Sequence, residues 1–300
     1  MPVDVNRPGP WNHRNLTARG TRFHVALAGP EAPSGSGVLT LLIHGFPECW
    51  WTWRHVIPAL AQAGHRVAAL DLRGFGGSDR PPSGYDLVTL AQDIAAVVRS
   101  LGHERAMVIG AGLGGQVAWA LPHVAPDLTT AIVPVGAPHP LALRSLRSRA
   151  LSGPALQYAS LQIPGLAERR LRSRSALEGL LRSWAGPHTR EAVAEEAPYY
   201  AELLSRPGAA RSALEPLRNL ILSRAETAAL ERPVTVPVLS VQGQLDPVQP
   251  AQAYARDTHH VTGNLHQATI RRSGHFPQEE APAELVRALM PFLAEVAPAV

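Results

Sequence analysis

The chain alternates short apolar runs with amphipathic segments over most of its length. The apolar runs have the length of buried strands, and the segments between them carry apolar residues at helical spacing. Strands are predicted in 15–28, on both sides of a turn at Arg19 and Gly20, and over 38–43, 66–72, 128–135, 236–241 and 267–272. Helices are predicted between Glu48 and Ala63 and over 89–101, 250–258 and 282–296. This alternation predicts an α/β fold with a mostly parallel central sheet and helices on both faces.

The alternation stops between His139 and about Arg232, where only helical stretches with Pro and Gly breaks occur. A helical insertion between two strands of the sheet, folded over the site as a cap, explains this pattern. We therefore expect one core domain made of two segments, 1–140 and 216–300, and a helical cap over 141–215.

Composition places the chain among globular proteins, with 45% hydrophobic and 17% charged residues. No run approaches the ~18 apolar residues of a membrane-spanning helix. Residues 1–14 are polar and rich in proline, without the apolar region of a secretory signal. Cys49 is the single cysteine, which excludes an intrachain disulfide and fits a reducing compartment. We therefore expect a cytoplasmic protein.

The formal net charge is +4, and all 28 basic residues are arginine. Nine of these arginines lie between Leu141 and Arg190, against only Glu168 and Glu178. Such a basic run could attract an anionic substrate or a membrane surface. A solvated helical face is the commoner explanation, so we expect neither a membrane contact nor a nucleic-acid partner.

The segment 106–119 has the layout of a nucleophile elbow. It begins as an apolar strand, passes through the glycine-dense turn G-A-G-L-G-G and continues as a helix. The elbow motif is G-x-S-x-G when the nucleophile is serine. Here Gly110 and Gly114 are the flanking glycines, and Gly112 occupies the position of the nucleophile. The reactive side chain of a covalent hydrolase is therefore missing.

Glycine at this position is what backbone stability alone would favour. The elbow forces its central residue to positive φ, which costs another residue roughly 1–3 kcal/mol, whereas glycine adopts that conformation without a Cβ clash. A phosphate-binding glycine loop is the alternative interpretation. It is weak, because no Lys-Ser or Lys-Thr follows the glycines.

An acid and a histidine follow the last two predicted strands before the final helix. Asp246 lies in G-Q-L-D-P after one strand, and His275 lies in S-G-H-F-P after the next. Ligands bind at the carboxyl ends of strands in open α/β sheets. The order of nucleophile position, acid and histidine is that of α/β-hydrolases.

Taken together, these motifs resemble the α/β-hydrolase superfamily and, within it, the epoxide-hydrolase-like group. The resemblance extends over nearly the whole chain. It is strongest in H-G-F-P-E-C-W-W-T-W-R at 44–54, D-L-R-G-F-G-G-S-D-R-P at 71–81, the elbow at 110–115 and G-A-P-H-P at 136–140. It implies the α/β-hydrolase fold with a helical cap.

In that group an elbow aspartate attacks an epoxide carbon and forms an ester, which a histidine oriented by an acid then hydrolyses with water. By this resemblance Asp246 orients His275, and the backbone N–H groups of Phe46 and Leu113 form the oxyanion hole. The resemblance also implies an apolar pocket, which we expect to include His44, Pro47, Trp50, Ala111, Gln157, Tyr158 and Leu217.

The chain departs from the family at the groups that carry the chemistry. Ala111 replaces the histidine that usually precedes the nucleophile. Two cap tyrosines protonate the epoxide oxygen in the family. The first donor position falls on Gln157, with Tyr158 one residue away, and the second falls on Leu217. Neither Gln157 nor Leu217 can release a proton.

Other candidates have ordinary structural explanations. Cys49 could be a displaced nucleophile, but a lone cysteine beside tryptophans is more often a buried small hydrophobe. Tyr199 and Tyr200 could replace the cap acids, although paired tyrosines in a helical cap usually pack. The adjacent His259 and His260 face different directions on a helix end, so we expect no metal site there.

Three hypotheses about function remain open. In the first, the Asp246–His275 pair activates water directly, which gives impaired hydrolysis. In the second, the chain is a pseudoenzyme that binds a small apolar or epoxide- or ester-like ligand. In the third, it is a lyase or proton-abstraction enzyme with His275 as base. None of the three calls for a cofactor, and we expect none.

Overall fold

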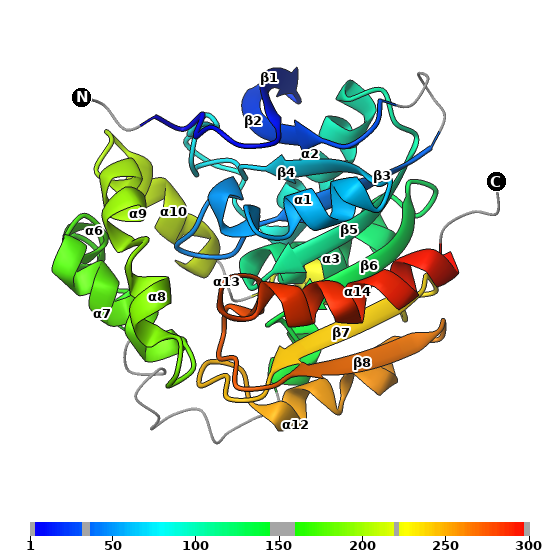
Figure 1. Ribbon diagram of the computed structural model, residues 1–300. Coiled ribbons are helices and arrows are strands. Elements are labelled where there is room, and N and C mark those ends of the chain that lie inside the picture. Colours follow the sequence, from blue (N-terminus) through cyan, green and yellow to red (C-terminus); the bar gives the residue numbers. More distant parts are fainter. Residues whose placement is uncertain (1–3, 32–36, 145–159, 219–221, 297–300) are drawn as a thin grey trace.

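An eight-stranded sheet forms the centre of the computed structural model, which describes residues 4–31, 37–144, 160–218 and 222–296. The strand order is β1-β2-β4-β3-β5-β6-β7-β8 (Figure 1). The β1–β2 and β2–β4 pairs are antiparallel, and every later neighbouring pair is parallel. The strands are β1 (Asn12–Ala18), β2 (Thr21–Ala28), β3 (Val38–Ile43), β4 (Arg66–Leu70), β5 (Arg105–Ala111), β6 (Thr129–Val135), β7 (Val238–Gly243) and β8 (Leu265–Ile270). The predicted α/β fold with a mostly parallel sheet is confirmed.

Helices cover both faces of this sheet. In Figure 1, α1 and α14 lie on one face, and α2 and α3 lie on the other. Strands β3 and β5 are buried almost throughout because both of their faces are covered. This is why they read as continuous apolar runs rather than alternating ones. The core helices are α1 (Ile57–Gln62), α2 (Leu87–Ser100), α3 (Leu113–Val124), α4 (Pro140–Arg144), α11 (Arg224–Leu230), α12 (Ala251–Tyr254), α13 (Pro277–Glu280) and α14 (Pro282–Val296).

Two predicted helices are shorter than the sequence pattern suggests. The segment after Glu48 forms a 3₁₀ turn, Trp50–Trp53, and then α1, which begins beside Pro58. Proline has no N–H to donate and its ring favours the first turn of a helix, so Pro58 fits the start of α1 and not the interior of one continuous helix. The helix predicted over 250–258 ends at Tyr254 and is followed by a second 3₁₀ turn, Asp257–His260.

A group of helices lies beside one edge of the core. None of the described residues between 139 and 232 is in a strand. Helices α6 to α10 lie together in Figure 1, in the region where the sequence predicts a cap. They are α6 (Leu166–Leu171), α7 (Arg174–Trp184), α8 (Arg190–Ala194), α9 (Ala197–Leu204) and α10 (Ala209–Arg218). The predicted cap boundary at 215 falls inside α10, and the division into domains stays a prediction. Over the described ranges, no helix has both the length and the apolar character needed to cross a membrane.

A buried ion pair fastens α2 to the loop after β4. Arg73 donates to Asp93, and the two side chains are 7% and 1% exposed. Arg73 also donates to the backbone oxygen of Ser83 at 3.0 Å. Removing one partner of a buried pair leaves the other charge uncompensated in a medium of low dielectric constant.

We therefore expect Asp93→Ala to lower the free energy of unfolding by about 3–5 kcal/mol. Asp79→Ala is the matched control, because Asp79 pairs with Arg22 at 3.1 Å with both side chains about half exposed. Its cost should be at most about 1 kcal/mol. Urea unfolding of both variants measures the difference, and equal costs would contradict this account.

Candidate active site

Gly112 occupies the corner between β5 and α3. Its φ is +47° and its ψ is −110°, a conformation that L side chains rarely adopt. Its N–H donates to the oxygen of Val135 at 2.9 Å, and its own oxygen accepts from the N–H of Gln116 at 3.0 Å. The corner is therefore fixed on one side to β6 and on the other to the first turn of α3.

The three elbow glycines have different reasons to be glycine. A Cβ on Gly110 would lie 2.2 Å from the oxygen of Gly114, and a Cβ on Gly114 would lie 2.4 Å from the oxygen of Ile43. A Cβ on Gly112 would meet only His275 Nε2 at 3.4 Å and the Cα of Gly45 at 3.6 Å. Close backbone packing thus excludes side chains at the two flanking positions. At Gly112 a Cβ fits in ordinary van der Waals contact and faces the imidazole.

His275 and Asp246 form a buried pair, as the order of motifs predicts. His275 Nδ1 lies 2.9 Å from Asp246 Oδ2, and their side chains are 8% and 1% exposed. The backbone N–H groups of Val248 and Gln249 donate to the other carboxylate oxygen. Burial alone would lower the pKa of His275, but the charge and hydrogen bond of Asp246 outweigh it and raise that pKa above its ordinary value. Nδ1 donates to the carboxylate, which leaves Nε2 as the atom that can accept a proton.

The loop that carries His275 is held by contacts to the cap. The His275 N–H donates to the oxygen of Trp184 at 2.9 Å. One oxygen of Glu280 accepts from the N–H groups of Gly274 and Gly186 at 2.8 and 2.7 Å. The Trp184 ring meets the His275 ring edge to face, with centroids 5.5 Å apart. Cap and core therefore fix the position of the imidazole together.

The two predicted oxyanion donors flank Gly112. Leu113 is the first residue of α3, where backbone N–H groups have no partner within the helix. The N–H of Phe46 has no hydrogen-bond partner among the described residues. His44 Nε2 accepts from the N–H of Leu72 at 3.1 Å, which ties the segment before Phe46 to the loop after β4. Burial lowers the pKa of His44, which keeps its ring neutral.

Glu48 is a candidate acid that the sequence reasoning does not single out, although it lies in the H-G-F-P-E segment. It is 3% exposed and accepts from the hydroxyl of Thr52 at 2.6 Å. Burial, reinforced by the nearby Glu279 carboxyl, raises the pKa of Glu48 to about 8. This carboxyl is therefore protonated at neutral pH and can donate a proton. Its charged form would also interact with His275.

A small pocket lies between the core and the cap helices, beside Glu48. Its lining residues are Pro47, Glu48, Cys49, Gly74, Phe75, Gly76, Tyr200, Leu203, Leu204 and Ala209. Of the predicted pocket residues, Pro47 lines this cavity. The Glu48 carboxyl and the Tyr200 phenol are the oxygen acids in its wall, and most of the remaining lining is apolar or backbone.

The other predicted pocket residues that the structure describes do not line this pocket, and their roles stay predictions. Trp50 is fully buried, and its Nε1 donates to the oxygen of Val5 at 3.0 Å. Ala111 is buried at the end of β5, and Leu217 is buried on α10. Gln157 and Tyr158 lie outside the described residues.

The remaining reactive candidates behave as buried groups. Cys49 is 1% exposed, and burial raises the pKa of its thiol well above the usual value, so it stays protonated. Tyr199 and Tyr200 are also buried, and burial raises both of their pKa values. Within the described ranges, no group of three or more His, Cys, Asp or Glu side chains could hold a metal ion.

The sheet order, the elbow and the acid–histidine pair define an α/β-hydrolase. A family model described as alpha/beta hydrolase fold matches residues 40–282. The chain belongs to this family, and within it to the epoxide-hydrolase-like group.

Three relatives illustrate the similarity. Epoxide hydrolase B of Mycobacterium tuberculosis is 44% identical over 128 residues, which cover 42% of this chain and 35% of that protein. This match thus spans about a third of the relative's length. The AB hydrolase superfamily protein YfhM of Bacillus subtilis is 31% identical over 93% of this chain and 96% of its own. A solved epoxide hydrolase from an endophytic Streptomyces is 29% identical, with a TM-score of 0.79 over 96% of this chain and 97% of its own.

The elbow geometry predicts unequal costs for adding a methyl group to two neighbouring glycines. We expect Gly114→Ala to destabilise the fold by about 3 kcal/mol or more, because its Cβ would overlap backbone atoms. Gly112→Ala should cost only about 1–2 kcal/mol, from backbone strain alone. Thermal unfolding of the two variants tests this ranking, and a larger cost at Gly112 would refute it.

Proposed function

We propose that this protein hydrolyses small apolar epoxides or esters slowly, by direct activation of water at His275. The proposal rests on the position of a Cβ at Gly112, which would lie 3.4 Å from His275 Nε2 without overlapping another atom. A water oxygen bound in place of that Cβ would lie where the imidazole can take its proton. A covalent ester cannot form at the elbow, because glycine has no nucleophilic group. In this proposal the protein retains the activation of water by histidine and lacks the attack of an elbow carboxylate on the substrate.

The proposed step is a single displacement for an epoxide. His275 Nε2 takes a proton from water as the water oxygen bonds to an epoxide carbon, and the bond from that carbon to the ring oxygen breaks. Asp246 orients the imidazole and stabilises its positive charge once it is protonated. For an ester, water attacks the carbonyl carbon instead, and the N–H groups of Phe46 and Leu113 stabilise the oxyanion.

Glu48 is the proposed source of the proton for the epoxide oxygen. Its raised pKa supports this role, since the carboxyl is protonated at neutral pH. It also lines the cavity between core and cap, beside the loop of the proposed oxyanion hole. The imidazolium and the Glu48 carboxylate then exchange protons with solvent, and both groups return to their starting states.

A binding protein without turnover is the second candidate function. It is favoured by Leu217, which is buried and apolar at the position where the family places a proton donor. General-base assistance alone contributes about 10²–10⁴-fold to a rate. A protein left with this assistance alone would turn over only reactive substrates, and with less reactive ones it would act as a binder.

The first test is the dependence of hydrolysis on His275. With styrene oxide and 4-nitrophenyl acetate as probes, we expect His275→Ala to reduce kcat/KM by about 10²–10⁴-fold. His266→Ala is the matched control, because the side chain of this β8 histidine is about half exposed and pairs with Glu295. Activity that survives His275→Ala would refute catalysis by this histidine. Ligand-dependent thermal stabilisation without any turnover would establish the binding function instead.

The pH profile tests both proton-transfer roles. His275 must be neutral to act as base, so activity should rise as pH increases through its raised pKa, which lies above the ordinary 6.5. Glu48 must be protonated to act as acid, so epoxide hydrolysis should fall again above a pH of about 8. In Glu48→Gln this alkaline decrease should disappear. Its persistence in that variant would assign it to another group.

Restoring a carboxylate at the elbow tests the geometry of the missing nucleophile. We expect Gly112→Asp, combined with His275→Ala so that the ester is not hydrolysed, to trap styrene oxide as an ester on the new side chain, detected as a mass increase equal to one epoxide. The substitution should cost about 1–3 kcal/mol in backbone strain. Gly165→Asp, at another positive φ with open space around the added Cβ, controls for nonspecific alkylation. A folded variant without an adduct would show that the elbow does not present its side chain to the pocket.

A further inference from the structure

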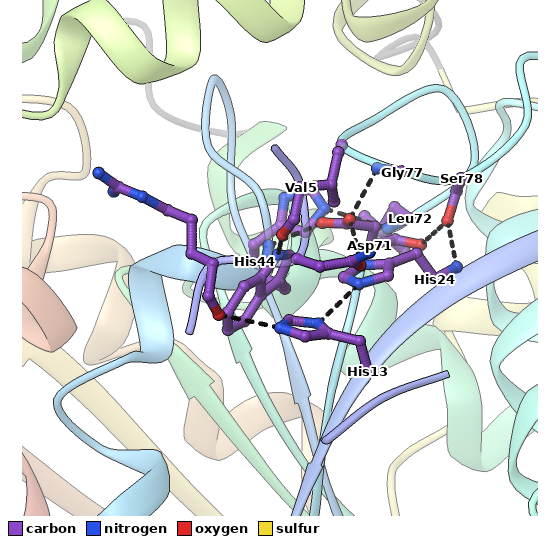
Figure 2. Close-up of polar contacts among 12 residues, drawn as sticks. Val5, His13, His24, His44, Asp71, Leu72, Gly77 and Ser78 are labelled. Carbon is purple, nitrogen blue, oxygen red and sulfur yellow. Dashed lines mark hydrogen bonds and ion pairs between the residues drawn. The ribbon is translucent and has the colours of Figure 1, made fainter. Parts of the chain in front are cut away.

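A chain of hydrogen bonds runs from the buried core to the N-terminal segment (Figure 2). His24 Nδ1 lies 2.8 Å from Asp71 Oδ2, and His24 Nε2 lies 3.0 Å from His13 Nδ1. His13 Nε2 lies 2.9 Å from the backbone oxygen of Arg7. Figure 2 shows the His24 ring next to Asp71 and the His13 ring beyond it.

The hydrogen bonds fix the number of protons on the two rings. A carbonyl oxygen only accepts, so His13 Nε2 must carry a proton toward Arg7. Asp71 also accepts from the N–H groups of Trp50 and Gly77 at 2.8 Å each. Burial alone would raise the pKa of Asp71, but the hydrogen bond and charge of His24 outweigh it and lower that pKa, so the carboxylate is ionised. The three hydrogen bonds end on two groups that only accept, the Asp71 carboxylate and the Arg7 oxygen, so the two rings must supply one proton for each bond. Two neutral histidines carry two ring protons, and the third proton gives the pair one positive charge.

A fourth proton would break this chain of bonds. It would place N–H groups on both nitrogens that face each other across 3.0 Å, with two positive rings in contact. Burial lowers the pKa of His13, and the proximity of His24 lowers it further. The hydrogen bond to the Arg7 oxygen and the carboxylates of Asp4 and Asp71 act in the opposite direction on His13, so this bond to Arg7 is kept when the ring is protonated. The other titratable groups that interact with Asp71 include His44, held neutral, and Cys49 and Tyr199, held protonated.

The N-terminal strap, residues 4–11, joins this core network to the cap. The oxygen of Val5 accepts from Trp50 Nε1 at 3.0 Å. The Arg7 guanidinium pairs with Glu196, immediately before α9, at 3.2 Å. It also lies over the rings of Trp51 and Tyr199, 4.2 and 4.4 Å from their centroids. Arg7 thus links the histidine pair, through its backbone oxygen, to the cap, through its side chain.

We propose that the N-terminal strap is an acid-released latch between core and cap. Protonation of His13 breaks its bond to His24, displaces Arg7 and separates its guanidinium from Glu196. The lowered pKa of His13 determines the direction in which stability changes with pH. The folded protein holds the neutral ring, so the stability this group contributes is present above the ordinary pKa of about 6.5 and is lost as pH falls below it.

Hydrogen–deuterium exchange measured at about pH 7.5 and about pH 5, with intrinsic rates corrected, tests the latch. We expect the protection factors of residues 4–13 and of α9 to fall at least roughly fivefold at the lower pH, the equivalent of one lost buried hydrogen bond. In His13→Phe, which keeps a ring but cannot titrate, this pH dependence should disappear. His266→Gln should respond as the wild type does.

Arg7→Met separates the two ends of the latch and needs no change in the buried network. In this variant the strap should still respond to acid, whereas α9 should not. Equal protection at both pH values in the wild type would overturn the proposal. So would an acid response that persists in folded His13→Phe, or an α9 that still responds without the Arg7 charge. These outcomes concern conformation alone, so they stand apart from any result on hydrolysis.

Discussion

The close approach of backbone atoms around the elbow is the constraint on which the site depends. Strand β5, the first turn of α3 and the end of β3 meet so closely that neither Gly110 nor Gly114 has room for a Cβ. That contact sets the direction in which the position of Gly112 faces. It also leaves the N–H of Leu113 at the N-terminus of α3. The elbow is thus a property of the backbone and persists with glycine at its centre.

Buried charges around this corner are held by several partners each. Asp246 accepts from the His275 ring and from two backbone N–H groups, and Asp71 accepts from the His24 ring and two others. Because the desolvation of a carboxylate is costly, such arrangements exist only where every oxygen is satisfied. In both networks a buried carboxylate orients a histidine ring. One of them faces the space at Gly112, and the other faces the N-terminal strap.

Sequence patterns predict the core of this molecule well because its strands are buried on both faces. The continuous apolar runs of β3 and β5 and the glycines of the elbow each follow from a single local requirement. The acid–histidine pair was predictable from the order of motifs, and the structure brings Asp246 and His275 within hydrogen-bonding distance. Glu48 was not, because its protonation depends on burial by residues distant in the sequence, Glu279 among them. The role of the N-terminal strap was also hidden, since a polar, proline-rich segment gives no sign of which side chains it will meet.

The Glu280 carboxylate binds the N–H of Gly274 next to the proposed base and the N–H of Gly186 in the helical segment above it. The Glu280 side chain therefore fixes the loop that carries His275 relative to the helical segment that carries Gly186. A chimaera that exchanges 141–215 for the equivalent segment of another hydrolase would remove one half of this bridge. The exchange preserves this contact only when the segment from the other hydrolase places a backbone N–H at the same point.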